Sequence, residues 1–247
     1  MYKFDRLHYS IRGSYHVWDQ KGKGILKLDT IHSHGQDIFN GVLAINYGKG
    51  AKMSFVPREI TVDFEGGHQN ITLFGTDGSY IKGNGKEILV EIAKTHAKFD
   101  YQVVQNDVIE LCDFKNNCSI MFVPVKGSLK IEKSRPAGEV VSEFVNIRVT
   151  PDANGEYAFS IETNYLNKGG VGAKGMSYDY YADMAVNDYL AWEKKFAPKN
   201  KYEKECAYIL WSNIIAPLGN FDTEAIVMSK SGMSNVWSWD NAFNALG

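Results

Sequence analysis

The feature that most constrains this chain is a long series of short alternating segments between Ile25 and about Leu166. In each segment apolar residues take every second position, which is the period of a strand with one buried face. Glycine, asparagine and aspartate fall between the segments, where tight turns need positive φ. No helical period interrupts the series, so the pattern predicts an antiparallel β-sandwich. The expected strands include 60–64, 71–74, 88–92, 144–149 and 157–163, and turns are expected at 65–67, 76–78, 83–85 and 154–155.

The composition changes at the glycine-rich stretch 167–175, which we interpret as a linker. After it, Ser177 is placed to cap a helix that runs to about Phe196 with an apolar side. A second helix is expected over 202–216, and its apolar residues lie nearly all round, so it needs cover on several sides. A short strand or extended loop is expected at 221–228.

The last residues place two large aromatic side chains beside a carboxylate: Trp237, Trp239 and Asp240. Sugar rings stack on indole and their hydroxyls bond to carboxylates, so this group suits a sugar. The alternative is that Asp240 caps a helix beginning near Asn241 while the tryptophans pack in a core. From these residues alone the second interpretation is favoured, because caps and buried tryptophans are the commoner use.

Three stretches together resemble glycoside hydrolase family 63 and its bacterial relatives, namely 214–219, 225–230 and 236–246. This is the processing α-glucosidase family, and it includes mannosylglycerate hydrolase-like enzymes. The resemblance implies an N-terminal β-sandwich (a supersandwich), a helical linker and an (α/α)6 barrel, the six-hairpin glycosidase architecture. The expected fold is therefore mainly β, followed by the linker and the first elements of that barrel.

The resemblance divides the chain into a sandwich at 1–170, a glycine-rich then helical linker at 171–200, and a truncated barrel start at 201–247. It also implies an inverting glycosidase whose general acid and base lie in later parts of the barrel. No catalytic residue is therefore assigned here. Trp237, Trp239 and Asp240 would bind substrate, with Asp240 holding hydroxyls.

On this interpretation the chain is the N-terminal part of an inverting glycoside hydrolase acting on α-linked glucose or mannose in oligosaccharides. It would be inactive alone, and its partners would be an oligosaccharide substrate and the remainder of the catalytic barrel. One alternative is a non-catalytic carbohydrate-binding or scaffolding β-sandwich module. Another is a related enzyme with glycogen-debranching or trehalase-like activity.

Two further groups could form sites. His32 and His34 would share one face of a strand and could bind a metal with Asp29 or Asp37 as a third ligand. A histidine pair without a special role is favoured, and no metal or cofactor is expected.

The N-terminal aromatic group could be a sugar-stacking platform, but packing in the sandwich is favoured; it comprises Tyr9, Tyr15, His16 and Trp18. Cys112 and Cys118 could bridge across a hairpin, although free cysteines are the favoured interpretation.

Charge and hydropathy exclude other partners. The 27 basic and 29 acidic residues are mixed along the chain, without the basic block that a nucleic acid or an anionic membrane would require. No apolar run reaches the length of a membrane span. Residues 1–6 are too polar for the centre of a signal peptide. The chain as written is therefore expected in the cytoplasm, or exported if a leader has been removed.

Overall fold

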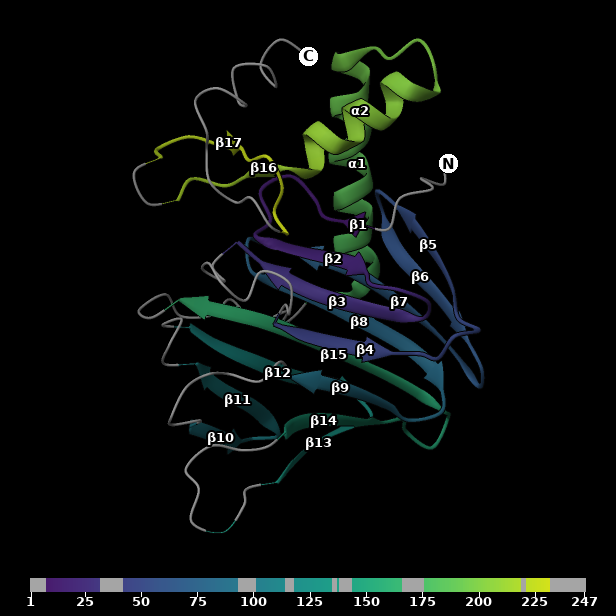
Figure 1. The fold of residues 1–247 in the computed structure, drawn as a ribbon, viewed down its shortest axis with the longest axis vertical. Helices are drawn as coiled ribbons and strands as arrows, with labels where there is room; N and C mark the ends of the chain where they lie inside the picture. The colour runs from purple at the N-terminus through teal and green to yellow at the C-terminus, as the bar shows by residue number, and fades with distance from the viewer. Residues whose placement is uncertain are drawn as a thin grey trace.

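The computed structural model describes residues 8–31, 42–92, 101–113, 118–134, 137, 144–165, 176–218 and 221–231. These residues form two large antiparallel sheets packed face to face, with two helices at one end (Figure 1). The predicted antiparallel β-sandwich is confirmed. Neither of the two described helices is long and apolar enough to cross a membrane.

One sheet has seven strands in the order β1-β2-β3-β4-β9-β14-β13. Its strands are β1 (His8–Tyr9), β2 (His16–Gln20), β3 (Ile25–Thr30), β4 (Leu43–Asn46), β9 (Ile88–Ile92), β14 (Phe144–Thr150) and β13 (Ser128–Ser134). The β-structure thus begins before Ile25, because the N-terminal residues supply two strands of this sheet.

The other sheet has eight strands in the order β10-β11-β12-β15-β8-β7-β6-β5. Its strands are β10 (Tyr101–Gln105), β11 (Val108–Asp113), β12 (Cys118–Lys126), β15 (Glu156–Tyr165), β8 (Gly78–Gly85), β7 (Gly67–Phe74), β6 (Glu59–Phe64) and β5 (Lys52–Val56). Hairpins join most neighbours, whereas the pairing of β8 with the distant β15 joins the two halves of the sheet.

The predicted turn at 83–85 is wrong, because these residues continue β8. Gly83 pairs with Gln69 on one side and Tyr157 on the other. A Cβ atom at Gly83 would lie 2.5 Å from the ring of Tyr157. Glycine at this position therefore permits a close approach of a buried aromatic ring, which the sequence pattern could not distinguish from a turn. The turns at 65–66, 75–77 and 153–154 lie where they were expected.

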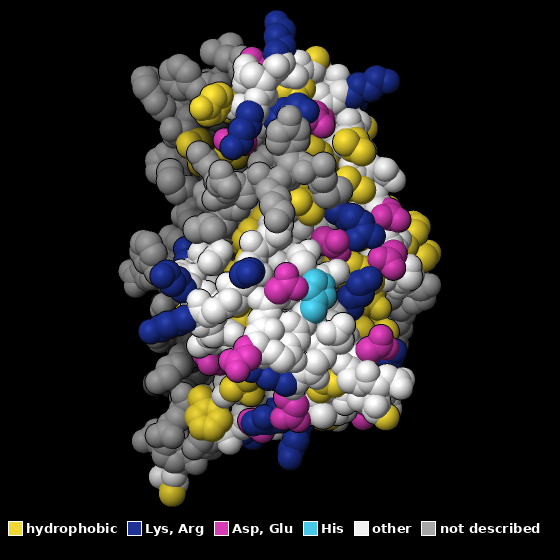
Figure 2. All heavy atoms as spheres, turned by 90° about the vertical axis from the view of Figure 1, so that its right-hand side faces the viewer, with side chains coloured by type: hydrophobic (Ala, Val, Ile, Leu, Met, Phe, Trp, Pro, Cys, Tyr) yellow, Lys and Arg dark blue, Asp and Glu magenta, His cyan; other side chains and the backbone are white. Residues whose placement is uncertain are grey.

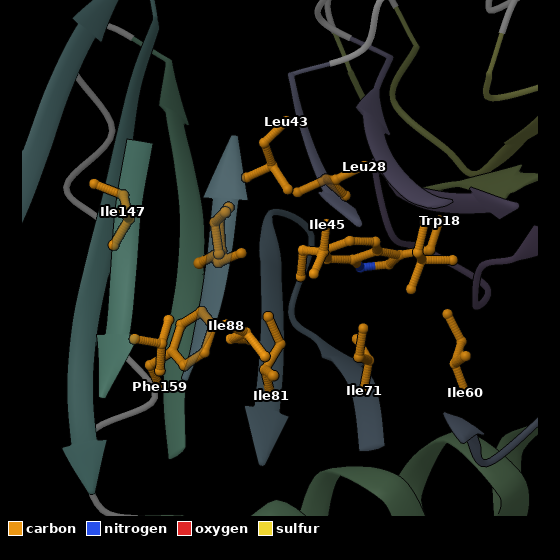
Figure 3. Packing of buried hydrophobic residues seen from close by; sticks show 14 of the residues in the cluster. Trp18, Leu28, Leu43, Ile45, Ile60, Ile71, Ile81, Ile88, Ile147 and Phe159 are labelled. Atoms are coloured by element: carbon orange, nitrogen blue, oxygen red, sulfur yellow. The ribbon is translucent and has the colours of Figure 1, made fainter. Parts of the chain in front are cut away.

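The core lies between the inner faces of the two sheets, where Figure 3 shows Trp18 and Ile45 opposite Ile71 and Ile81. Trp18 and Phe159 are fully buried. The expected packing of the N-terminal aromatic group is confirmed, since all four side chains are buried; they are Tyr9, Tyr15, His16 and Trp18. A sugar-stacking platform built from them is excluded because their faces are covered.

Helix α1 (Tyr178–Phe196) has the expected bounds, and the hydroxyl of Ser177 accepts a hydrogen bond from the amide of Tyr180 at 3.2 Å. It packs on the outer face of the eight-stranded sheet, where Tyr178 and Ala182 meet Phe74 and Tyr80. The end of the helix nearest the sheet is held by charge as well.

Arg58 bonds to Asp183 at 3.2 Å and to Asp179 at 3.1 Å, and Lys82 also bonds to Asp179. Acidic and basic side chains are interspersed over the face that Figure 2 shows, which has no block of one sign. The bonds of Arg58 and Lys82 to Asp179 and Asp183 fix helix α1 to the sandwich.

Helix α2 (Lys201–Ser212) is shorter than the predicted 202–216. After the helix, β16 (Ile214–Ile215) pairs with β17 (Ala225–Ile226), which confirms the extended segment expected at 221–228. The apolar residues at 214–215 are thus buried by a small ladder and by the N-terminal segment, and a longer helix is not needed to cover them. The barrel elements and the domain bounds 1–170, 171–200 and 201–247 stay predictions.

The free thiol expected for Cys112 is confirmed. In the β11–β12 ladder Cys112 lies opposite Ser119, and Cys118 lies opposite Asp113. The two cysteines are therefore out of register for a direct cross-strand bridge.

Candidate functional site

The predicted substrate-binding residues Trp237, Trp239 and Asp240 lie outside the described residues, which end at Ser231. The histidine pair 32 and 34, and Asp37, lie outside them too. The structure does describe how the chain that leads to the tryptophans is held. We call residues 213–231 the C-terminal segment, and residues 8–16, on which it lies, the N-terminal strap.

Backbone hydrogen bonds join the two segments. The amide of Gly13 donates to the carbonyl of Ile214 at 2.9 Å, and Gly13 forms a parallel bridge with Ile215. Gly13 has φ of 80°, a conformation that glycine adopts at little cost. Figure 1 shows the N-terminal strap passing beside β16. The contact joins parts of the chain about two hundred residues apart.

An apolar cluster lies beneath this bridge. Tyr15 and Ile31 pack against Ile215 and Val227, and all four side chains are buried. The hydroxyl of Tyr15 also donates to the carbonyl of Pro217 at 2.9 Å. The C-terminal segment therefore covers apolar residues of the sandwich that would otherwise face water.

Arg12 connects the strap to two further elements. Its Nε and Nη2 bond to the carboxylate of Glu224 at 2.9 and 2.5 Å, and its Nη1 lies 3.9 Å from Asp188 on α1. Asp188 in turn accepts a hydrogen bond from Trp211 Nε1 at 2.7 Å. The hydrogen bonds that Arg12 donates to Glu224 raise the pKa of Arg12. Both carboxylates are thus held by a cation, which suits a structural role better than proton transfer.

Lys230, one residue before the described part of the chain ends, has a buried amine. The residue is 2% exposed, and its Nζ donates to Ser10 Oγ at 3.0 Å and to the carbonyl of Ile11 at 2.8 Å. Both acceptors are uncharged, and no carboxylate of the described residues forms an ion pair with it. Burial lowers the pKa of Lys230 well below its ordinary value of 10.5.

A buried polar network lies behind the strap. His16 Nε2 lies 2.8 Å from Thr163 Oγ1, and Nδ1 lies 2.9 Å from Ser79 Oγ. Trp18 can only donate to Ser79, and Thr163 donates to Asp77. Because the Thr163 hydroxyl donates to Asp77, its oxygen accepts the hydrogen bond from His16 Nε2. This network anchors the base of the strap between the two sheets.

A second polar group lies on the outer face of β2 and β3. Lys27 Nζ is 3.5 Å from Asp29 Oδ1, and both residues are buried. Asp29 Oδ1 and Oδ2 and Asp19 Oδ2 have no hydrogen-bond partner within the described part of the chain. Burial raises the pKa of Asp29 to about 6, although Lys27 opposes the rise. Within the described ranges no group of three or more potential ligands could hold a metal ion.

The contacts of Arg12, Glu224 and Lys230 were not predicted from the sequence. Lys230 follows a short apolar run and is flanked by serines, a context that is unusual for a solvated lysine. That context could have marked the lysine as buried. Its acceptors could not have been found, because they are 219 and 220 residues away in the chain.

Comparisons with known proteins add one structural likeness. No protein-family model matches the chain, and no curated protein sequence does. Among solved structures, the chain is similar to the family GH92 inverting mannosidase BT2199 from Bacteroides thetaiotaomicron VPI-5482. The TM-score is 0.59 at 6% identity, and the match covers 90% of this chain and 40% of the mannosidase. The chain therefore shares its fold with part of a glycoside hydrolase, while the resemblance to family 63 stays a prediction.

Proposed function

We propose that this chain is the N-terminal part of an inverting glycoside hydrolase that acts on α-linked mannose or glucose in oligosaccharides. In this proposal Trp237, Trp239 and Asp240 belong to the subsite that holds the released sugar. The fold likeness to part of an inverting mannosidase supports the class of enzyme. The identity of the sugar rests on the sequence resemblance.

The observation that carries the proposal is the attachment of the C-terminal segment to the strap. Backbone bonds at Gly13, the Arg12–Glu224 pair and the buried Lys230 hold the chain as far as Lys230, which precedes Trp237 by seven residues. A sugar site needs its aromatic faces and carboxylate held at defined positions. A sandwich that holds the entry to the motif can supply this rigidity.

The proposed chemistry needs two carboxyl groups that the proposal does not place in this chain. Inversion requires one protonated acid at the leaving oxygen and one carboxylate that activates water, roughly 6.5–9.5 Å apart. Asp188 and Glu224 are both engaged by Arg12, so neither is assigned to this work. Asp240 would accept hydrogen bonds from sugar hydroxyls, which is a binding role.

The competing function is a carbohydrate-binding or scaffolding sandwich without catalysis. Such a module would need exposed aromatic rings on a strand face. Among the strand residues whose exposure the structure describes, the exposed large apolar side chains are Val104, Val125 and Phe144, of which only Phe144 is aromatic. One isolated ring gives a poor stacking surface, so the enzyme proposal is the better supported one.

The test is to assay the 247-residue chain beside the product of its complete reading frame, against α-linked manno- and gluco-oligosaccharides. NMR of the first product formed reports inversion or retention at the anomeric carbon. We expect the complete product to hydrolyse one class with inversion and the 247-residue chain to be inactive. Equal activity of the two, or an inactive complete product, would contradict the proposal.

A further inference from the structure

We propose that Lys230 is a positioning residue, whose buried amine fastens the C-terminal segment to the N-terminal strap and so fixes the entry to the Trp237–Asp240 motif. The inference deepens the proposed function and rests on it for its importance to sugar binding. The fastening itself can be tested without any sugar.

The geometry distinguishes Lys230 from an ordinary surface lysine. Its Nζ donates to Ser10 Oγ and to the carbonyl of Ile11, and Ser10 Oγ in turn donates a hydrogen bond to the carbonyl of His16 at 2.7 Å. One chain of hydrogen bonds thus runs from the C-terminal segment into β2. Ser10 is fully buried, so these bonds are shielded from water.

Among the described residues, no carboxylate forms an ion pair with the amine of Lys230. Arg12 bonds to Glu224 and lies 3.9 Å from Asp188. His8 Nε2 contacts Ser212 Oγ, and His16 bonds to Ser79 and Thr163. An ammonium ion buried beside two neutral acceptors is costly, whereas a neutral amine can make the same bonds.

This arrangement predicts a pH dependence with a definite sign. The pKa of Lys230 is lowered by burial in the docked state and returns to about 10.5 when the segment is released. The released state therefore binds more protons below pH 10.5, so lowering the pH from that value favours release. If Lys230 acted by packing alone, release of the C-terminal segment would not depend on pH in this range.

The experiment is hydrogen–deuterium exchange of residues 225–231 in the 247-residue chain between pH 7 and pH 10. The variants are Lys230→Ala, Lys230→Gln and Lys230→Arg, with Lys49→Met as a control at an exposed lysine. Comparison with the control at each pH removes the intrinsic pH dependence of exchange. The readout does not depend on whether the proposed function is correct.

We expect Lys230→Ala to exchange roughly tenfold faster, because two buried hydrogen bonds are lost. Lys230→Gln keeps a neutral donor and should recover most of the protection, while Lys230→Arg, which is always charged, should not. In the native chain and in Lys49→Met, the protection of residues 225–231 from exchange should depend on pH. In Lys230→Gln this dependence should disappear. An unchanged slope in Lys230→Gln, or native protection in Lys230→Ala, would overturn the inference.

Discussion

The interior of the sandwich and the junction between the strap and the C-terminal segment are held together in different ways. In the interior, regular ladders bury apolar side chains from alternate positions of each strand, as at Ile71 and Ile81. At the junction, single polar contacts join residues that are about two hundred positions apart, as at Arg12 and Glu224. Local periodicity therefore determines the scaffold, while long-range polar contacts determine how the C-terminal segment is attached to it.

The largest effect is expected in the interior. Phe159→Ala removes a fully buried ring on the central strand β15 and should lower the free energy of unfolding by about 3–5 kcal/mol. The change in the free energy of unfolding is measured by urea denaturation, monitored by circular dichroism. Val104→Ala, at a side chain that is 61% exposed, should change stability by less than about 0.5 kcal/mol. Equal effects of the two substitutions would contradict the assigned core.

The buried charges on the outer face of β2 and β3 should give a smaller effect that depends on pH. The pKa of Asp29 is about 6 in the folded chain against an ordinary 3.8, so the folded state binds the extra proton between these values. Its contribution to stability is present below pH 3.8 and is lost as the pH rises through 6. The difference corresponds to at most about 3 kcal/mol.

The measurement is the free energy of unfolding of the native chain and of Asp29→Asn at several values between pH 4 and pH 7. The native chain should lose stability relative to the variant as the pH rises. Glu91→Gln, at an exposed carboxylate on β9, serves as the control and should track the native chain. A constant difference between the native chain and Asp29→Asn would refute the raised pKa.

The smallest effect is expected at the junction and should be local. Arg12→Ala removes the ion pair with Glu224, which is partly exposed, and should cost at most about 1 kcal/mol. Faster hydrogen exchange is expected at 221–231, with the sandwich strands unchanged. Arg148→Ala removes a similar pair with Glu132 within the sheet and should leave 221–231 unaffected. Faster exchange throughout the sandwich in Arg12→Ala would show that the two regions are not separate.

The same contrast explains what could be predicted from the sequence. Alternation and turn residues located the strands, and Ser177 marked the start of α1. Residues 83–85 were predicted as a turn because the ring of Tyr157, which leaves no room for a Cβ atom at Gly83, is distant in the sequence. Helix α2 was predicted too long because the strap that binds Ile214 and Ile215 could not be foreseen. Lys230 was missed for the same reason, since its partners lie at the other end of the chain.

The most direct test of the account is to locate bound sugar by hydrogen–deuterium exchange. The 247-residue chain would be measured with α-linked mannobiose, with maltose and without sugar, each at high millimolar concentration. The account predicts that one of the sugars protects residues 236–241, and that Asp240→Ala abolishes the protection. Protection confined to strands of the sandwich, with 236–241 unchanged, would contradict the account and favour a carbohydrate-binding module.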